Sequence, residues 1–371
     1  MMLSPQVEII ILACLTAAAC AVVGVFLILR RVALMSDAIS HAILLGIVVA
    51  FFYTKNLSSP WLLIAAAITG VLTVTLTELI IHTQKLKKDA AIGLVFPFLF
   101  SIGVIMINRY TSDVHIDSDC VLFGEIAFSP FNRFVLGGTD LGPLGFWTMG
   151  GIFLANLAFI SLFYKELKLA TFDAGLAAAL GFSPLIIHYV LMTLVSVTAV
   201  SAFEHVGSIL VVALMIAPPA TAYLLTDRLS HMVILSALLG MAAALSGYFM
   251  AYYLDASIAG SMATMSGVIF LLALIFAPER GLLVKYVLRR WQRWEFPTET
   301  LAVHLLQAEM TQADDTEHVV SHMKRHMLWP DEFTSEVIAR SIEEGIITKD
   351  GNKLILTDYG REKAKVAIAQ S

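Results

Sequence analysis

The stretch RRVALMSDAISHAILLGIVVAF, residues 30–51, governs the interpretation of the chain, because it places ionisable side chains inside an apolar run long enough to cross a membrane. Asp37 and His41 are four residues apart, a spacing that sets both side chains on one face of a helix. Counted along a helix from Arg31, Asp37 is expected roughly 9 Å and His41 roughly 15 Å away, near the middle of a core about 30 Å thick. Ionisable groups at that depth are costly and usually mark a pathway or a relay.

Two explanations of this pair are open from the residues alone. The first is structural: Asp37 and His41 satisfy each other, with Ser36 and Ser40, inside a packed helix interface. The second is functional, since a carboxylate and an imidazole on one helix face can reach the same cation. This mixture of oxygen and nitrogen ligands suits Mn²⁺, Zn²⁺ or Fe²⁺ and does not choose among them.

Composition places the chain in a membrane. Of its 371 residues, 58% are hydrophobic and only 14% are charged, and the mean hydropathy of +0.81 lies far above that of a soluble globular protein. The three cysteines do not form a disulfide framework or a CxxC metal site. A net charge of −5 argues against a nucleic-acid footprint for the chain as a whole. The sequence therefore predicts an all-α polytopic membrane protein.

About nine apolar runs have spanning length. They are Val7–Leu29, Ala33–Tyr53, Pro60–Ile81, Ala91–Ile107, Leu144–Tyr164, Leu185–Phe203, Ser208–Leu225, Met232–Leu254 and Ala259–Phe276. Lys and Arg collect after the first, third, fifth, seventh and last runs, whereas the intervening loops are poor in them. Because positively charged loops stay inside, we expect the N-terminus outside and the C-terminus in the cytoplasm.

A short segment, Thr171–Pro184, lies between the fifth and sixth runs. It is too short to span a bilayer and too apolar to remain in water. A short amphipathic helix between two spans suits docking to a cytoplasmic partner. The alternative is an interfacial helix that lies on the membrane.

The seventh run contains two adjacent prolines, Pro218 and Pro219. Proline removes the backbone N–H that a helix needs, so this pair predicts a broken helix inside the bilayer. Such breaks are tolerated where neighbours or a water-lined cavity satisfy the freed carbonyls, which is typical of the moving parts of transporters.

The composition changes after Gly281, and we divide the chain into a transmembrane domain over 1–280, a basic juxtamembrane linker over 281–297 and a cytoplasmic domain over 298–371. In the last part, Asp350-Gly351 between two apolar runs predicts a hairpin. Helices are expected at Glu299–Met310, Thr316–Leu328, Asp331–Glu344 and Asp358–Ala369. This order outlines a small α+β winged-helix-like domain.

Several motifs in the transmembrane part carry a family resemblance. They are Arg-Arg-x-Ala-Leu-x-x-Asp37-Ala-Ile-Ser-His41-Ala, Leu122-Phe-Gly124-Glu-Ile, Val206-Gly207 through Pro219, and Leu225-Thr-Asp-Arg228. In this order they resemble the permease subunits of ATP-binding-cassette importers for manganese, zinc or iron, over roughly the first 280 residues. The family usually has Gly in place of Ser36 and Pro in place of Leu45, departures that leave the Asp-His pair intact.

The resemblance implies a multi-pass permease of the bacterial cytoplasmic (plasma or inner) membrane. Such a permease forms a homo- or heterodimer, receives metal from an external metal-binding protein and is driven by a separate ATPase. By this likeness Asp37 and His41 match the family's metal-binding pair in the transport path. The part that docks on the ATPase matches Phe172–Gly181, with the candidate docking residues Phe172, Asp173, Leu176 and Gly181. The chain has no GxxxxGK motif followed by Ser or Thr, so it is not expected to be an enzyme itself.

The tail resembles the winged helix of iron- and manganese-dependent repressors, in Val337-Ile-Ala-Arg-Ser-Ile-Glu-Glu-Gly345 and Leu356-Thr357-Asp-Tyr-Gly360-Arg. Its charge argues against a simple role in binding DNA, because residues 300–371 hold eight Lys and Arg against twelve Asp and Glu. The repressors' separate dimerisation domain is also missing.

A histidine stripe in the tail offers another role. His318, His322 and His326 recur every four residues, so successive members turn only about 40° around the expected helix and line one side of it. Adjacent pairs at this spacing can share one cation, which makes the three a candidate regulatory metal site. The alternative is a partly exposed helix that happens to be rich in His.

The sequence thus predicts the permease subunit of an importer for a divalent transition metal, embedded in lipid and carrying a regulatory tail. No cofactor beyond the transported metal is expected. The competing interpretation is a membrane-tethered, metal-responsive regulator whose tail binds DNA or another protein. The number of spans and the intramembrane Asp-His pair exceed what a simple anchor needs, and therefore favour the permease.

Overall fold

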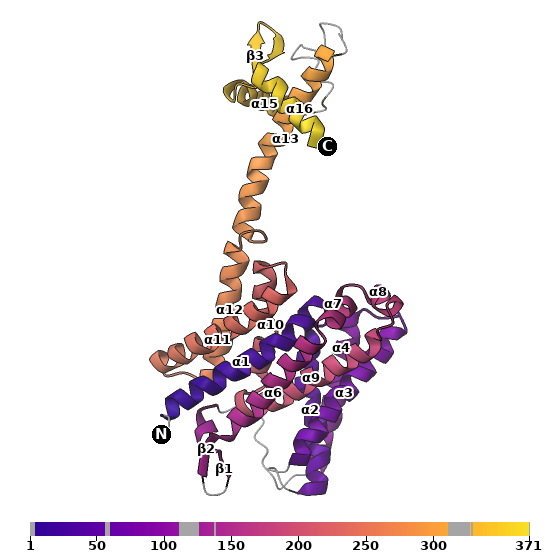
Figure 1. The fold of residues 1–371 in the computed structure, drawn as a ribbon, viewed down its shortest axis with the longest axis vertical. Coiled ribbons are helices and arrows are strands. Elements are labelled where there is room, and N and C mark those ends of the chain that lie inside the picture. The colour runs from indigo at the N-terminus through magenta and orange to yellow at the C-terminus, as the bar shows by residue number, and fades with distance from the viewer. Residues whose placement is uncertain are drawn as a thin grey trace. The chain divides into compact units, whose positions relative to one another are not determined.

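The structure is a computed structural model that describes residues 4–55, 60–110, 126–136, 139–310, 327 and 329–370 (Figure 1). The chain divides into two compact units, Met1–Gly281 and Leu282–Ser371. The first unit is mostly helical, and the second combines helices with a β-hairpin.

In the described residues, nine helices are long and apolar enough to cross a membrane. They are α1 (Pro5–Leu29), α2 (Leu34–Thr54), α3 (Pro60–His82), α4 (Lys88–Tyr110), α6 (Leu144–Leu162), α9 (Pro184–Val206), α10 (Ser208–Leu225), α11 (Leu229–Leu254) and α12 (Ile258–Phe276). Each coincides with a predicted apolar run, so the expected multi-pass helical architecture is confirmed. The agreement is close because an apolar bilayer admits backbone only as complete helices or closed barrels.

Helix α1 is the core of the first unit. Nearly every side chain from Leu12 to Leu27 is buried, and α1 packs against α6, α9, α10 and α11. The sequence LTAAACAVVGV over residues 15–25 supplies mostly small side chains. Small side chains let helix backbones approach closely, which gives packing energy where lipid supplies no hydrophobic driving force between helices.

Helix α10 continues through Pro218 and Pro219, so the broken helix predicted there is not observed. Both prolines are buried, and Pro219 has no N–H to donate to the carbonyl of Met215 four residues earlier. Helix α1 packs directly on this carbonyl: a Cβ added to Gly24 would overlap the Met215 oxygen and would lie 2.9 Å from Pro219 Cγ. Close packing by α1 thus covers the Met215 carbonyl, which has no N–H donor at Pro219.

Replacing Gly24 with Ala should therefore destabilise the bundle, because a Met215 backbone atom cannot move aside as a flexible side chain would. We expect a loss of about 1–3 kcal/mol in the free energy of unfolding, the usual range for overpacking a close contact. Thermal unfolding of the purified protein in detergent measures this. Gly267→Ala on α12 is the matched control, since a Cβ there meets no atom within 4 Å. Equal stability of the two variants would contradict the proposed packing.

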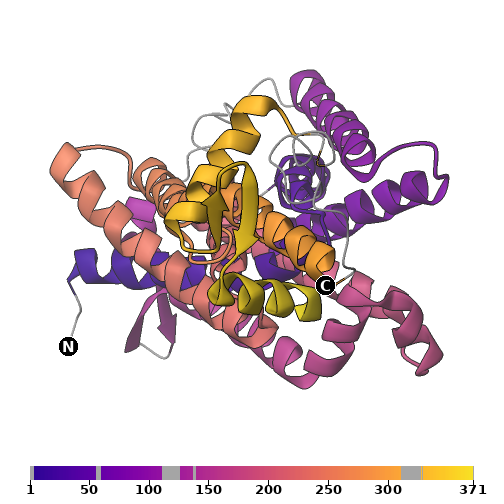
Figure 2. The same ribbon diagram turned by 90° about the horizontal axis from the view of Figure 1, so that it is seen from above.

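An ion-pair cluster holds a short hairpin against the first turns of α1 (Figures 1 and 2). The 3₁₀ helix η1 (Ile126–Phe131) leads into β1 (Arg133–Leu136), which pairs antiparallel with β2 (Thr139–Pro143). Arg133 Nε donates to Asp140, and its Nη1 and Nη2 lie 3.4–3.5 Å from the buried carboxylate of Glu8 on α1. Two hydrogen bonds lower the pKa of Asp140 below its usual range: the larger effect comes from the Gly142 N–H and the smaller from Arg133. These contacts fix the hairpin to the first turns of α1.

The second unit has its own hydrophobic core. Its described elements are α13 (Leu282–Met310), α15 (Asp331–Glu343), β3 (Ile347–Asp350), β4 (Lys353–Leu356) and α16 (Asp358–Gln370), which gather at one end of α13 (Figures 1 and 2). Leu305, Val337 and Leu354 are among its buried side chains. Arg361 on α16 donates through Nε and Nη2 to Glu309 on α13, at 2.9 and 3.1 Å.

The hairpin predicted in the tail is confirmed. Strands β3 and β4 pair antiparallel, and Gly351 in their turn has φ +60°, a conformation that favours glycine. The expected helix Thr316–Leu328 falls almost wholly outside the described residues. The two small antiparallel sheets of the described chain do not establish a winged helix.

Candidate functional site

Asp37 and His41 lie together on α2, as their spacing predicts. His41 Nε2 is 3.4 Å from Asp37 Oδ1, which is longer than an ordinary hydrogen bond. The His41 ring packs against two aromatic rings of α4: its centroid is 5.8 Å from that of Phe96 and 6.0 Å from that of Phe100. The pair is thus a loose contact beside an aromatic wall, and neither group is saturated by the other.

The pair lies closer to the start of α2 than the sequence suggested. The predicted depth counted helical rise from Arg31, but Arg31 has φ +57° and stands in a turn, and α2 begins only at Leu34. Asp37 therefore lies in the first turn of α2, with His41 roughly 10 Å from the helix start. The pairing of the two side chains is observed, and their depth in the membrane stays a prediction.

The two serines do not complete the pair. The Ser36 hydroxyl donates to Ala33 O at 2.9 Å, and the Ser40 hydroxyl donates to Ser36 O at 2.9 Å, so both bond the backbone of their own helix. The Asp37 and His41 side chains remain 38% and 33% exposed. Within the described part of the chain, no group of three or more His, Cys, Asp or Glu could hold a metal ion. Among the described residues the pair thus presents two candidate ligands, fewer than the four that a tetrahedral site needs.

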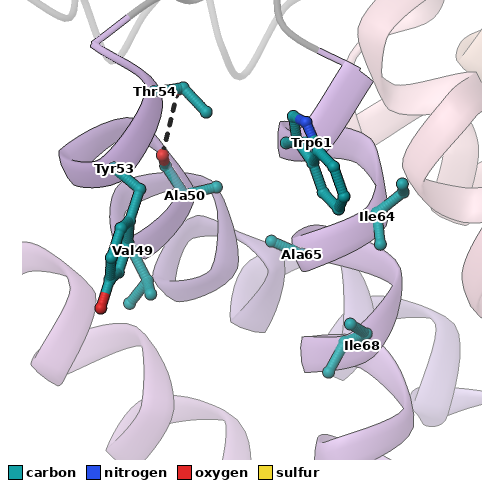
Figure 3. A pocket seen from close by; sticks show the side chains of 8 residues that line it. All are labelled: Val49, Ala50, Tyr53, Thr54, Trp61, Ile64, Ala65 and Ile68. Atoms are coloured by element: carbon teal, nitrogen blue, oxygen red, sulfur yellow. Dashed lines mark hydrogen bonds between the residues drawn. The ribbon is translucent and has the colours of Figure 1, made fainter.

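A second exposed region of α2 lies further along the helix, at Val49 and Tyr53. Near Tyr53, α2 and α3 border an apolar groove of about 390 Å³ (Figure 3). Its lining residues are Val49, Ala50, Tyr53, Thr54, Trp61, Ile64, Ala65 and Ile68. The pair and the groove lie on different sides of α2, because each step of four residues turns about 40° around the helix axis and Tyr53 therefore stands about 120° around from His41.

The predicted docking segment begins at the last residue of α7 (Tyr164–Phe172) and contains α8 (Ala174–Ala179). Asp173 divides the two helices, because its carboxylate accepts from the Leu176 N–H at 2.9 Å and caps α8. The short helix expected between the fifth and sixth runs is thus observed as α8. Phe172 is 62% exposed and Leu176 is 47% exposed, and both line a groove of about 480 Å³ with Lys165 and Lys168. Gly181, at φ +87°, lies in the turn that leads to α9.

The remaining candidate metal ligands of the tail, His318, His322 and His326, lie outside the described residues. Their role as a regulatory metal site stays a prediction.

Sequence reasoning missed a polar cluster where α1, α3, α7 and α9 meet. Arg30, which follows α1, donates through Nε to Thr171 Oγ1 at 3.2 Å, and its Nη1 lies 3.1 Å from His188 Nδ1. His188 Nε2 is 3.1 Å from Glu78 Oε1, an ion-pair distance without the alignment of a full hydrogen bond. The rule that singled out Asp37 could have found it, since Glu78 and His188 are also ionisable residues inside predicted spans.

A comparison with protein families decides the classification of this bundle. Residues 5–277 match the model described as the ABC 3 transport family. The chain belongs to this family. It is therefore the membrane permease of an ATP-binding-cassette transporter and not itself an enzyme, with ATP hydrolysis in a separate subunit.

Relatives of this permease cover its length to different extents. It is 42% identical to the zinc transport system membrane protein TroD of Treponema pallidum (strain Nichols), over 98% of both chains. It is 48% identical to the manganese transport system membrane protein MntD of Bacillus subtilis (strain 168), over 73% of this chain and 92% of the relative. The solved structure of PsaBC from Streptococcus pneumoniae in complex with Fab is 30% identical, with a TM-score of 0.62, over 75% of this permease and 94% of that chain.

Proposed function

We propose that this permease imports a divalent transition metal, manganese, zinc or iron, and that Asp37 and His41 are its ligands in the transport path. The observation that carries the proposal is the open, loosely paired carboxylate and imidazole on α2. A pair that served only packing would be covered by its own chain and saturated by close hydrogen bonds. The relatives that are named for zinc and manganese transport support the same substrate class.

A second permease subunit completes the site in this proposal. Two chains related by a two-fold axis would bring two Asp37 and two His41 together, up to the four ligands of a tetrahedral metal. The partly exposed side of α2 that carries Asp37 and His41 is the surface through which they would meet. The PsaBC structure supports a pair of permease chains. The presence or absence of a second permease gene beside this one would distinguish a related chain from a second copy.

The other partners follow from the orientation proposed for the bundle. Basic residues collect at the end where α1 terminates and α7 and α8 lie, which supports a cytoplasmic position for that end. We assign Phe172–Gly181 as the docking segment for the ATPase on this side. The hairpin β1–β2 then lies on the external side, where a metal-binding protein delivers its cargo.

The tail is an addition to this machinery. The relative from Bacillus subtilis aligns along 92% of its own length without covering this whole chain, whereas the relative from Treponema pallidum aligns along 98% of both chains. A regulatory role therefore suits the unit Leu282–Ser371 better than a role in the transport path. Its acidic balance disfavours DNA as the ligand.

Metal content of cells tests the proposed function. Cells that express the permease with its ATPase and external binding protein should accumulate at least one of manganese, zinc and iron several-fold above cells that lack only this chain. Elemental analysis by mass spectrometry measures all three together. A membrane-tethered regulator would instead change transcript levels and leave metal uptake by the other subunits intact, and that result would overturn the proposal.

A further inference from the structure

The polar cluster of Arg30, Thr171, His188 and Glu78 joins the docking segment to the start of α2. Thr171 is the neighbour of Phe172, the exposed aromatic residue at the end of α7. Arg30 stands four residues before α2 and seven before Asp37. A contact between Arg30 and Thr171 thus spans 141 residues of sequence and connects the proposed ATPase-binding surface with the proposed metal ligands.

The chemistry of the cluster fixes its proton arrangement. Burial lowers the pKa of Arg30 to about 10, so its guanidinium is still charged at neutral pH and donates only. His188 Nδ1, 3.1 Å from Arg30 Nη1, must therefore accept. The ring's proton then resides on Nε2, the atom that lies 3.1 Å from the Glu78 carboxylate. His188 thus bridges a cation and an anion, with one nitrogen for each.

The cluster is also a junction of backbone elements. Between α1 and α2 the chain makes a tight turn in which Arg31 N donates to Ile28 O at 3.0 Å and Val32 N donates to Leu27 O at 2.9 Å. This turn leaves little slack, so a displacement of Arg30 moves the first residues of α2. Arg30 Nη2 is buried without a hydrogen-bond partner among the described residues, so the guanidinium is not locked by a full set of bonds.

We propose that Arg30, His188, Glu78 and Thr171 transmit movement of the ATPase-docking segment to α2, and that His188 is a positioning residue for coupled transport. The proposal rests on the proposed function. When the ATPase shifts α7, Thr171 moves Arg30, while His188 and Glu78 hold the guanidinium in register with α9 and α3. The start of α2, and with it the Asp37 and His41 ligands, follows. No member of the cluster touches the metal in this scheme.

The test uses the complete transporter, with ATPase and external binding protein, in liposomes. Mn²⁺ and Zn²⁺ entry and ATP hydrolysis are measured together, so that each variant yields a ratio of metal moved per ATP. His188→Leu removes both ring nitrogens, whereas in His188→Gln an amide oxygen accepts from Arg30 and an amide nitrogen donates to Glu78. Thr193→Val is the control on the same helix, because the exposed Thr193 hydroxyl bonds its own backbone.

We expect His188→Leu to lower the metal moved per ATP about tenfold or more, since it breaks a hydrogen bond to a charged group, while hydrolysis continues. His188→Gln should restore the ratio to within about threefold of wild type, and Thr193→Val should leave it unchanged. Thr171→Val removes one acceptor of Arg30. Its ratio of metal moved per ATP should lie between those of His188→Leu and His188→Gln.

Two outcomes overturn the inference: a wild-type ratio in His188→Leu, or a loss in His188→Gln as large as that in His188→Leu. If His188→Leu does not assemble with the ATPase, Thr171→Val and His188→Gln decide by the same ratio. Failure of the proposed function is distinguishable, because in that case the wild-type transporter itself moves neither metal.

Discussion

Asp37→Ala and His41→Ala should each lower metal uptake by at least about 100-fold, as expected for loss of a direct ligand where loss of a supporting contact already costs 10–100-fold. The reason lies in the small number of ligands. Asp37 and His41 are the two ligands that each chain supplies in the proposed site, so either substitution removes half of its contribution. Both side chains are partly exposed on α2, and their truncation leaves the buried faces of the helix unchanged. Insertion in the membrane and assembly with the ATPase should therefore persist.

Uptake of radioactive or isotopically enriched metal by cells with matched amounts of protein measures this effect. Ser40→Ala is one control, because the Ser40 hydroxyl bonds its own helix and not the pair. His231→Ala is another, since His231 is an exposed histidine on α11. Both controls should transport as wild type does. Normal metal accumulation by a well-expressed Asp37→Ala or His41→Ala permease would remove the pair from the transport path.

The parts of the site that the sequence predicts are those set by local geometry. Asp37 and His41 meet because residues four apart on any helix lie on one face, whatever surrounds them. The positions of the nine spans follow similarly, since length and hydropathy suffice in a bilayer. The distance of Asp37 and His41 from the start of α2 depends on the left-handed turn at Arg31, which the sequence does not indicate. A non-glycine residue in that conformation carries no strong sequence signal, so the sequence does not show that α2 begins only at Leu34.

The parts that the sequence did not predict depend on contacts between distant residues. Arg30 and His188 are 158 residues apart, and no local pattern indicates that they touch. The division between α7 and α8 is an intermediate case, because Asp is a preferred N-cap and Asp173 precedes a run of good helix formers. Helix α10 continues through Pro218 and Pro219, and α1 packs on it at Gly24. The prolines do remove backbone N–H donors, but packing by a neighbouring helix allows α10 to continue.

Phe172→Asp is expected to weaken binding of the ATPase by at least about 30-fold, a typical loss when an aromatic anchor is removed from the centre of an interface. Phe172 is 62% exposed at the end of α7, and with Leu176 it borders the groove that Lys165 and Lys168 also line. Apolar anchors flanked by cations suit a partner surface with an apolar pocket and an acidic rim. A carboxylate at position 172 would be buried in that pocket without a partner, which adds a desolvation cost to the lost contact.

Co-purification of the ATPase with tagged permease, followed by titration of the purified subunits, measures the change. Phe131→Asp is the matched control, because Phe131 is 81% exposed on η1, one membrane span away along the chain at the other end of α6. It should retain the ATPase in full. Asp173→Ala provides a further contrast: Asp173 caps α8, so its removal should loosen that helix and weaken binding less than the loss of the anchor. Undiminished ATPase binding by Phe172→Asp would show that α7 and α8 lie on the membrane surface instead of docking.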